Sequence, residues 1–334
     1  MMRPGLNNVN ILKNCSQALQ KFRSISSCTV VRATQNDNVF HITQPIKTKD
    51  HPDHLERNIP TETNRLEKTH ERFWEKVTLG NTRKGSQESS DYVILLDGKP
   101  IKTPAGNPLV IPSQKPSLAQ LTAHEWTVLP SLKIKPHLVP LTSLASRAID
   151  LAWTEHGNLS RIDSAALENI VEALLPYLDT DTLLVFAPYR DCEGKLRPAQ
   201  EKEYRPLISK AEKFWTDSSK SSKPMSLNWL DSETMGFSLN KQSSETKEAV
   251  SQWIRSLDTW KLVALERATM SAKSLIIGML VATGNISVPE AVRAATLETI
   301  YQTELWGEVQ DSHDVDFHDM QRTLASAYIL GSDK

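Results

Sequence analysis

The densest group of side chains that could do chemistry lies in residues 304–319, near the C-terminus. The segment holds two histidines, His313 and His318, and several carboxylates, among them Glu308 and Asp314. Imidazole and carboxylate groups are ligands for divalent metals, and His–Asp pairs serve in metal-dependent phosphohydrolases. One interpretation is therefore a metal-dependent hydrolase that uses the His313–Asp314 pair.

Two other interpretations compete with metal chemistry. Metal sites of this kind draw ligands from several separated helices, and His124, His137 and His156 stand in unrelated contexts. The segment could instead be a solvated acidic turn, with Asp314 or Asp316 capping the next helix. It could also recognise another protein, because a tryptophan within a charged rim is typical of an interface anchor.

Other signatures of catalysis are missing from the sequence. The chain has 12 glycines, but neither a phosphate-binding loop nor a dinucleotide-binding pattern. It has no Gly-x-Ser-x-Gly nucleophile elbow. Cys192 lies between Asp191 and Glu193, whose charges raise a thiol pKa and disfavour a nucleophile. We therefore expect no enzymatic activity and no cofactor.

Composition narrows the class of protein further. The net charge is -1, with 39% hydrophobic and 24% charged residues, an ordinary balance for a soluble domain with a sizeable core. Nucleic-acid binding usually needs a clearly basic surface. No apolar run reaches the ~18 residues that span a bilayer, and the longest, residues 275–282, predicts a buried helix. We expect neither nucleic-acid binding nor membrane insertion.

The N-terminal segment has the composition of a targeting signal. Residues 1–36 contain five Lys or Arg, several serines and no acidic residue, which is typical of a mitochondrial transit peptide. Residues 37–70 are polar and predict a flexible linker. With only three cysteines, two of them within residues 1–36, a reducing compartment is expected. The sequence therefore predicts a protein of the mitochondrial matrix.

The elements that must position these residues form an α+β, mainly multihelical fold. A small antiparallel β-rich subdomain is expected over residues 71–113, packed on a larger all-α domain over residues 114–334. Residues 92–96 are β-branched and aromatic, and Asp97-Gly98 predicts a hairpin turn within a meander that ends near residue 112. A short hairpin is expected within residues 224–240, and helices 244–257 and 259–282 are expected to form an αα-hairpin. The full set of expected helices is 117–128, 141–153, 162–177, 201–215 (kinked or broken near Pro206), 244–257, 259–282, 289–306 and 317–330.

Four groups of motifs, in order along residues 72–331, resemble the Atp-twelve family of ATP synthase assembly chaperones. The first is LLDGKPIKTP at residues 95–104, with Lys99 where the family usually has arginine. Next come EW at 125–126 with PLTSLA at 140–145, and YLDTDT at 177–182. The last combines Leu-Glu at 297–298, Tyr-Gln at 301–302, Trp-Gly at 306–307 and His-Asp at 313–314.

The resemblance implies a chaperone that binds the free alpha subunit of the ATP synthase until the alpha–beta hexamer forms. It also implies an important acidic residue in the last long helix, which we place at Glu298. Because Glu298, Gln302 and Trp306 are spaced four apart, a helix puts them on one face. We expect a monomer. The predicted partner-binding residues are Glu298, Gln302, Trp306, Glu308, His313 and Asp314.

Overall fold

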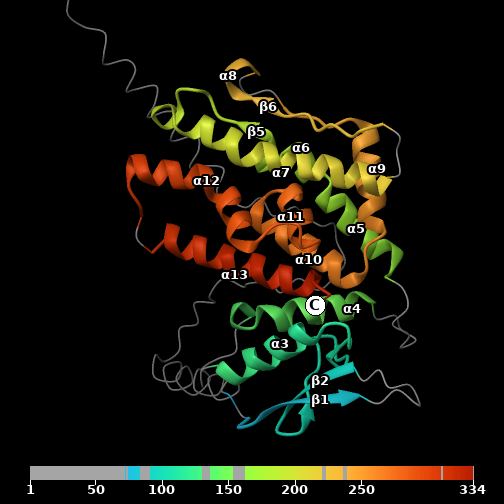
Figure 1. The fold of residues 1–334 in the computed structure, drawn as a ribbon. Helices are drawn as coiled ribbons and strands as arrows, with labels where there is room; N and C mark the ends of the chain where they lie inside the picture. The colour runs from blue at the N-terminus through green and yellow to red at the C-terminus, as the bar shows by residue number, and fades with distance from the viewer. Residues whose placement is uncertain are drawn as a thin grey trace, which may run out of the picture. The chain divides into compact units, whose positions relative to one another are not determined.

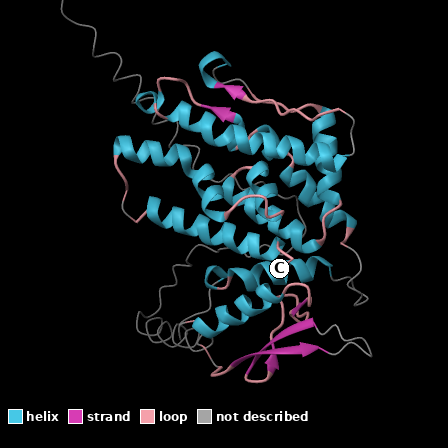
Figure 2. Ribbon diagram, viewed as in Figure 1, coloured by secondary structure: helices cyan, strands magenta, loops and turns pink. Residues whose placement is uncertain are grey.

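A computed structural model describes residues 72, 74–82, 91–129, 136–152, 162–219, 223–235, 239–309 and 311–333. All of them belong to one compact unit, Ile59–Lys334. The expected transit peptide, residues 1–36, and the expected linker, residues 37–70, lie outside the described residues. A small antiparallel sheet precedes a helical region, which confirms the α+β, mainly helical fold class (Figure 2).

The sheet is built around β2 (Asp91–Leu96). β1 (Val77–Thr82) pairs with one edge of β2, while β3 (Lys99–Pro100) and β4 (Val110–Ile111) share the other edge. The expected meander is therefore modified, because its last strand returns to β2. The predicted turn is confirmed, since Asp97 and Gly98 have φ values of 46° and 79°, as a type I′ hairpin requires.

Two helices connect the sheet to the rest of the fold. α3 (Pro116–Val128) packs on the sheet and on α4 (Pro140–Ala152). The Glu125 carboxylate of α3 accepts hydrogen bonds from the backbone N–H groups of Leu141 and Thr142, at 2.7 and 3.0 Å. These N–H groups have no partner within their own helix, so Glu125 satisfies the first turn of α4 from a neighbouring helix. Trp126 Nε1 donates to Thr142 Oγ1 at 2.9 Å and strengthens the same junction.

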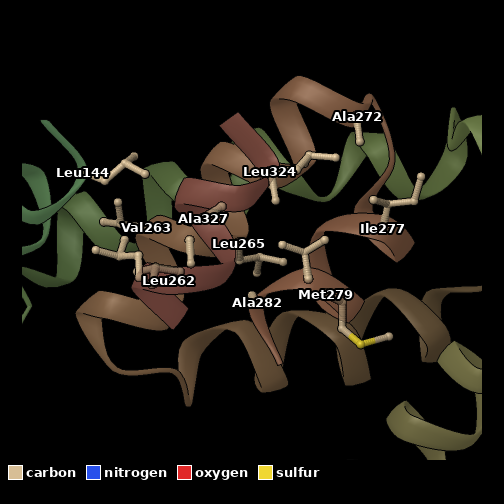
Figure 3. Close-up of a cluster of buried hydrophobic side chains, with 14 of the residues drawn as sticks. Leu144, Leu262, Val263, Leu265, Ala272, Ile277, Met279, Ala282, Leu324 and Ala327 are labelled. Carbon is tan, nitrogen blue, oxygen red and sulfur yellow. The ribbon is translucent and has the colours of Figure 1, made fainter. Parts of the chain in front are cut away.

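The hydrophobic core lies where α10 (Thr259–Ala272), α11 (Leu275–Ala282) and α13 (His313–Gly331) meet (Figure 3). Every residue of α11 is buried, as its apolar sequence predicts. No helix in the described ranges is long and apolar enough to cross a bilayer. The remaining elements are η1 (Pro136–Leu138), α5 (Ser164–Leu174), α6 (Pro176–Asp179), η2 (Thr182–Leu184), β5 (Val185–Phe186), η3 (Asp191–Gly194), α7 (Leu196–Ser219), β6 (Leu230–Asp231), α8 (Ser232–Met235), α9 (Ser244–Arg255) and α12 (Val288–Trp306) (Figure 1).

The helix expected over residues 259–282 is wrong as a single element. The backbone turns left-handed at Lys273, with a φ of 53°, and Ser274 then caps α11 by accepting the N–H of Ile277. α11 folds back so closely on α10 that a Cβ atom at Gly278 would lie 2.1 Å from Thr269 Oγ1. The αα-hairpin therefore consists of α10 and α11. The expected αα-hairpin was instead between the helices 244–257 and 259–282.

Three further expectations need correction. β6 pairs in parallel with β5, so the described residues of 224–240 form no hairpin of their own. α7 begins at Leu196 and continues as one helix through Pro206. α13 begins at His313, one turn earlier than predicted. Residues 313–316 of the acidic segment therefore belong to the helix rather than to the turn before it.

Candidate functional site

A groove of about 780 Å³ opens between α12 and the first turns of α13. Its walls include five of the six predicted partner-binding residues. These are Glu298 and Gln302 of α12, Glu308 of the connection, and His313 and Asp314 of α13. Trp306 does not line the groove. Its side chain is 73% exposed at the last residue of α12. The structure thus gathers the predicted polar residues and leaves the tryptophan beside them.

Local sequence rules position α12. Ser287 and Glu290 form a capping box at its N-terminus, and Pro289 occupies an early position where its missing N–H costs nothing. The buried face of α12 includes Ala291 and Leu297, which orients the helix on the core. Helix spacing then directs Glu298, which is exposed, and Gln302, which is half-buried, away from this buried face, so the sequence explains why they face the groove.

Glu298 is an exposed carboxylate held by its neighbour. Gln302 Nε2 donates to Glu298 Oε1 at 2.8 Å, which fixes one carboxylate oxygen. Burial and then the charge of Glu298 raise the pKa of Tyr204, so the field of this carboxylate reaches α7. Within the described part of the chain, Glu298 has no Lys or Arg at ion-pair distance. Its negative charge is available to a partner.

The charge of Glu298 also affects the pKa of the Cys192 thiol. Burial, followed by the charges of Asp191, Glu298 and Glu193, raises the pKa of its thiol. This is the direction that the neighbouring acids predict. A thiol with a raised pKa stays protonated at neutral pH and is a poor nucleophile.

The connection between α12 and α13 has its own hydrogen bonds. The Val309 carbonyl accepts the N–H groups of Ser312 and His313, at 3.2 and 3.3 Å. The Val309 N–H donates to His313 Nδ1 at 3.1 Å. Ser312 precedes α13 without a side-chain cap, so the expected cap at Asp314 or Asp316 is wrong. Both carboxylates instead lie in the first turn, where the helix dipole favours negative charge.

This geometry does not support the metal-hydrolase interpretation. No three His, Cys, Asp or Glu side chains converge on a possible metal position among the residues that the structure describes. One ring nitrogen of His313 already accepts a backbone hydrogen bond within the turn. The groove therefore offers polar and charged surface rather than a converging set of ligands.

Asp181, which belongs to the YLDTDT motif, is buried beside the break between α10 and α11. Asp181 is 0% exposed, and its carboxylate accepts hydrogen bonds from Ser274 Oγ at 2.6 Å and from the N–H groups of Leu183 and Ile276, both at 3.0 Å. Burial raises its pKa to about 6, against the opposing effect of these hydrogen bonds. Asp181 thereby holds the break between α10 and α11, and this break places Lys273 in the groove lining.

Comparison with solved structures identifies the class of fold. The crystal structure of Atp12 from Paracoccus denitrificans matches with a TM-score of 0.59 at 24% identity, over 79% of this chain and 100% of that one. A protein from Agrobacterium tumefaciens matches with a TM-score of 0.60 at 24% identity, over 84% of this chain and 91% of that chain. The architecture is thus that of the Atp12 fold.

Sequence relatives establish the family. A family model described as ATP12 chaperone protein matches residues 71–212. The mitochondrial protein ATP12 of Saccharomyces cerevisiae is 42% identical over 82% of this chain and 88% of its own length. The mitochondrial protein atp12 of Schizosaccharomyces pombe is 33% identical over 78% of this chain and 81% of its own length. The chain belongs to the ATP12 chaperone family, which confirms the resemblance of its motifs.

Proposed function

We propose that this chaperone is an assembly factor of the mitochondrial ATP synthase and that its client is the free alpha subunit. It works in the matrix as a monomer, without catalysis or a cofactor. The observation that carries this proposal is the 42% identity with the Saccharomyces cerevisiae relative over most of both chains. Residues 1–36 are then the transit peptide, residues 37–70 the linker, and residues 71–113 and 114–334 the two parts of the mature protein.

The groove between α12 and α13 suits such a role physically. A subunit without its partner exposes apolar interface and aggregates, so a chaperone must cover that interface and later release it. A charged groove gives specificity and rapid encounter with modest affinity, which permits transfer to a better partner. Glu298 is the central residue in this proposal, because its charge is exposed and has no cation beside it within the described residues.

Charge reversal at Glu298 tests the proposal directly. The Glu298→Lys variant should keep its circular dichroism spectrum and thermal midpoint, because the side chain lies on an exposed surface. Capture of purified free alpha subunit should fall by about tenfold or more, which corresponds to ~1.4 kcal/mol of binding free energy. The matched control is Glu172→Lys, which makes the same charge change on the exposed face of α5, away from the groove.

Three outcomes decide the matter. The proposal gains support if wild type and Glu172→Lys capture the alpha subunit and Glu298→Lys does not. Wild-type chaperone that prefers the beta subunit would contradict the choice of client. If Glu298→Lys captured the alpha subunit as well as wild type does, the groove would not be part of the binding surface. Gln302→Ala, which frees the held carboxylate oxygen, should produce a smaller loss than charge reversal.

A further inference from the structure

The end of α12 and the start of α13 expose an unusual concentration of apolar side chains. Of the twelve large hydrophobic side chains exposed in the described part of the chain, five fall within residues 305–317. Trp306, Val309 and Val315 are 73%, 60% and 55% exposed. Exposed apolar side chains gathered at one end of two helices are a candidate interaction surface. We call this set the apolar tip: Leu305, Trp306, Val309, Val315 and Phe317.

Carboxylates are concentrated in the stretch of sequence that contains the apolar tip. Between Arg293 and Arg322 the sequence contains no Lys or Arg, although the whole chain has almost balanced charge. The carboxylates of this interval are Glu298, Glu304, Glu308, Asp311, Asp314, Asp316 and Asp319. Asp319 pairs with Arg322, and Lys273 lines the groove, but the other carboxylates outnumber these cations, so the surface favours cationic groups over anionic ones.

The apolar tip and the groove form adjoining parts of one surface. Phe317 belongs to the tip and also lines the groove, next to Asp314. The Val309 carbonyl accepts the N–H groups of Ser312 and His313, and the Val309 N–H donates to His313 Nδ1, so Val309 is held against the start of α13. The backbone at Val309 is therefore ordered before a partner binds, which lowers the entropic cost of binding there.

We propose that the apolar tip and the groove together bind one short amphipathic segment of the client, with apolar side chains on one side and Lys or Arg on the other. This inference rests on the proposed function and specifies the chemistry of the segment that is recognised. Trp306 supplies the largest apolar anchor, and the carboxylates of the rim and groove pair with the cations. A groove of about 780 Å³ accommodates several side chains of one segment.

A defined set of peptides tests this chemistry on the full-length mature chaperone. The probes are a leucine–lysine amphipathic helix of about four turns, a leucine–glutamate helix of the same pattern, and a serine–lysine peptide that lacks apolar residues. Fluorescence anisotropy should show the leucine–lysine probe binding at least about tenfold more tightly than either of the others. Its affinity should also fall as salt rises, because exposed charges are screened.

Variants assign the binding to the apolar tip. Trp306→Ala should weaken the leucine–lysine probe by about tenfold or more, since tryptophan anchors dominate interface energies. Leu239→Ala is the matched control, because Leu239 is 82% exposed but lies outside the tip. Equal binding of the probe to wild type and Trp306→Ala, or equal binding of the lysine and glutamate probes, overturns the inference.

Parallel capture of the alpha subunit separates this inference from the proposed function. If wild type captures the subunit and Trp306→Ala captures it equally well, the inference fails while the proposed client stands. If wild type binds the leucine–lysine probe through Trp306 but captures no alpha subunit, the choice of client fails while the chemistry of the tip stands. Concentration-dependent dimerisation that disappears in Trp306→Ala would make a second copy the occupant and overturn the inference.

Discussion

Replacement of Asp181 by asparagine should change how the stability of the protein depends on pH. The folded-state pKa of this carboxyl is raised from its ordinary value of 3.8 to about 6, because burial penalises the charged form. The folded chain therefore holds this proton to higher pH than the unfolded chain does. The resulting stabilisation is fully present below about pH 4 and is lost as pH rises through about 6.

The expected magnitude follows from this difference in pKa. A rise from 3.8 to about 6 corresponds to roughly 3 kcal/mol, at ~1.4 kcal/mol per pKa unit. Asparagine does not titrate. The difference in the free energy of unfolding between wild type and Asp181→Asn should therefore depend on pH only through the titration of Asp181. Other carboxylates titrate in both proteins and cancel in the difference.

Urea unfolding of both proteins from pH 4 to pH 7.5 gives the required curve. The free energy of unfolding of wild type, minus that of Asp181→Asn, should fall by about 2.5 kcal/mol across this range, because the unfolded carboxyl is already partly ionised at pH 4. Ser274→Ala should move the midpoint upward, because it removes a 2.6 Å hydrogen bond that favours the charged form. A flat difference curve, or one that rises with pH, would refute the reasoning.

Three other substitutions probe the scaffold. Gly278→Ala should destabilise the protein by about 1–3 kcal/mol in urea unfolding, because the new methyl group meets Thr269 Oγ1, and adding Thr269→Ala should recover part of the loss. Glu125→Gln should lower the thermal midpoint at a cost of about 1–3 kcal/mol, since its amide group faces backbone donors. Lys115→Met should speed hydrogen exchange near the end of α13, because Lys115 Nζ donates to the carbonyls of Leu330 and Ser332 at 3.0 and 2.8 Å.

Local rules made much of the fold predictable. Asp97 and Gly98 marked a hairpin turn, and both adopt the positive φ that this turn needs. The helix expected over residues 259–282 ends just before Gly284, which has a φ of 70°, and the helix expected from residue 289 has Pro289 in the first turn of α12. In each case the chemistry of one or two residues decides the backbone, so no distant contact is needed to foresee it.

The break between α10 and α11 was not predictable in the same way. Residues 259–282 contain no proline, and the left-handed residue is Lys273, which has no intrinsic preference for that conformation. The break persists because Asp181, far away in the sequence, supplies acceptors for the new helix N-terminus. A tertiary contact here overrides local helix propensity.

The candidate site, like the fold, was predictable from the sequence only in part. Helix spacing alone predicted that Glu298, Gln302 and Trp306 would share a face. The structure brings Glu298 and Gln302 into the groove, but Trp306 does not line it. Trp306 was predicted as a partner-binding residue, but the rest of the apolar tip could not be foreseen, because Val309 and Val315 resemble core residues in sequence. They become surface only because α13 begins at His313 and α12 ends at Trp306, which leaves both helix ends beyond the core.

Different residues stabilise the fold and form the proposed binding surface, so measurements of stability and of client capture can tell them apart. The motif carboxylates Asp97, Glu125 and Asp181 all accept backbone N–H groups that would otherwise lack partners, and none of them lines the groove. Substituting them should reduce stability and client capture together, because the groove is lost with the fold. Substituting Glu298 or Trp306 should reduce capture alone, because both side chains are exposed. The ratio of the two losses therefore distinguishes a residue that builds the chaperone from one that contacts its client.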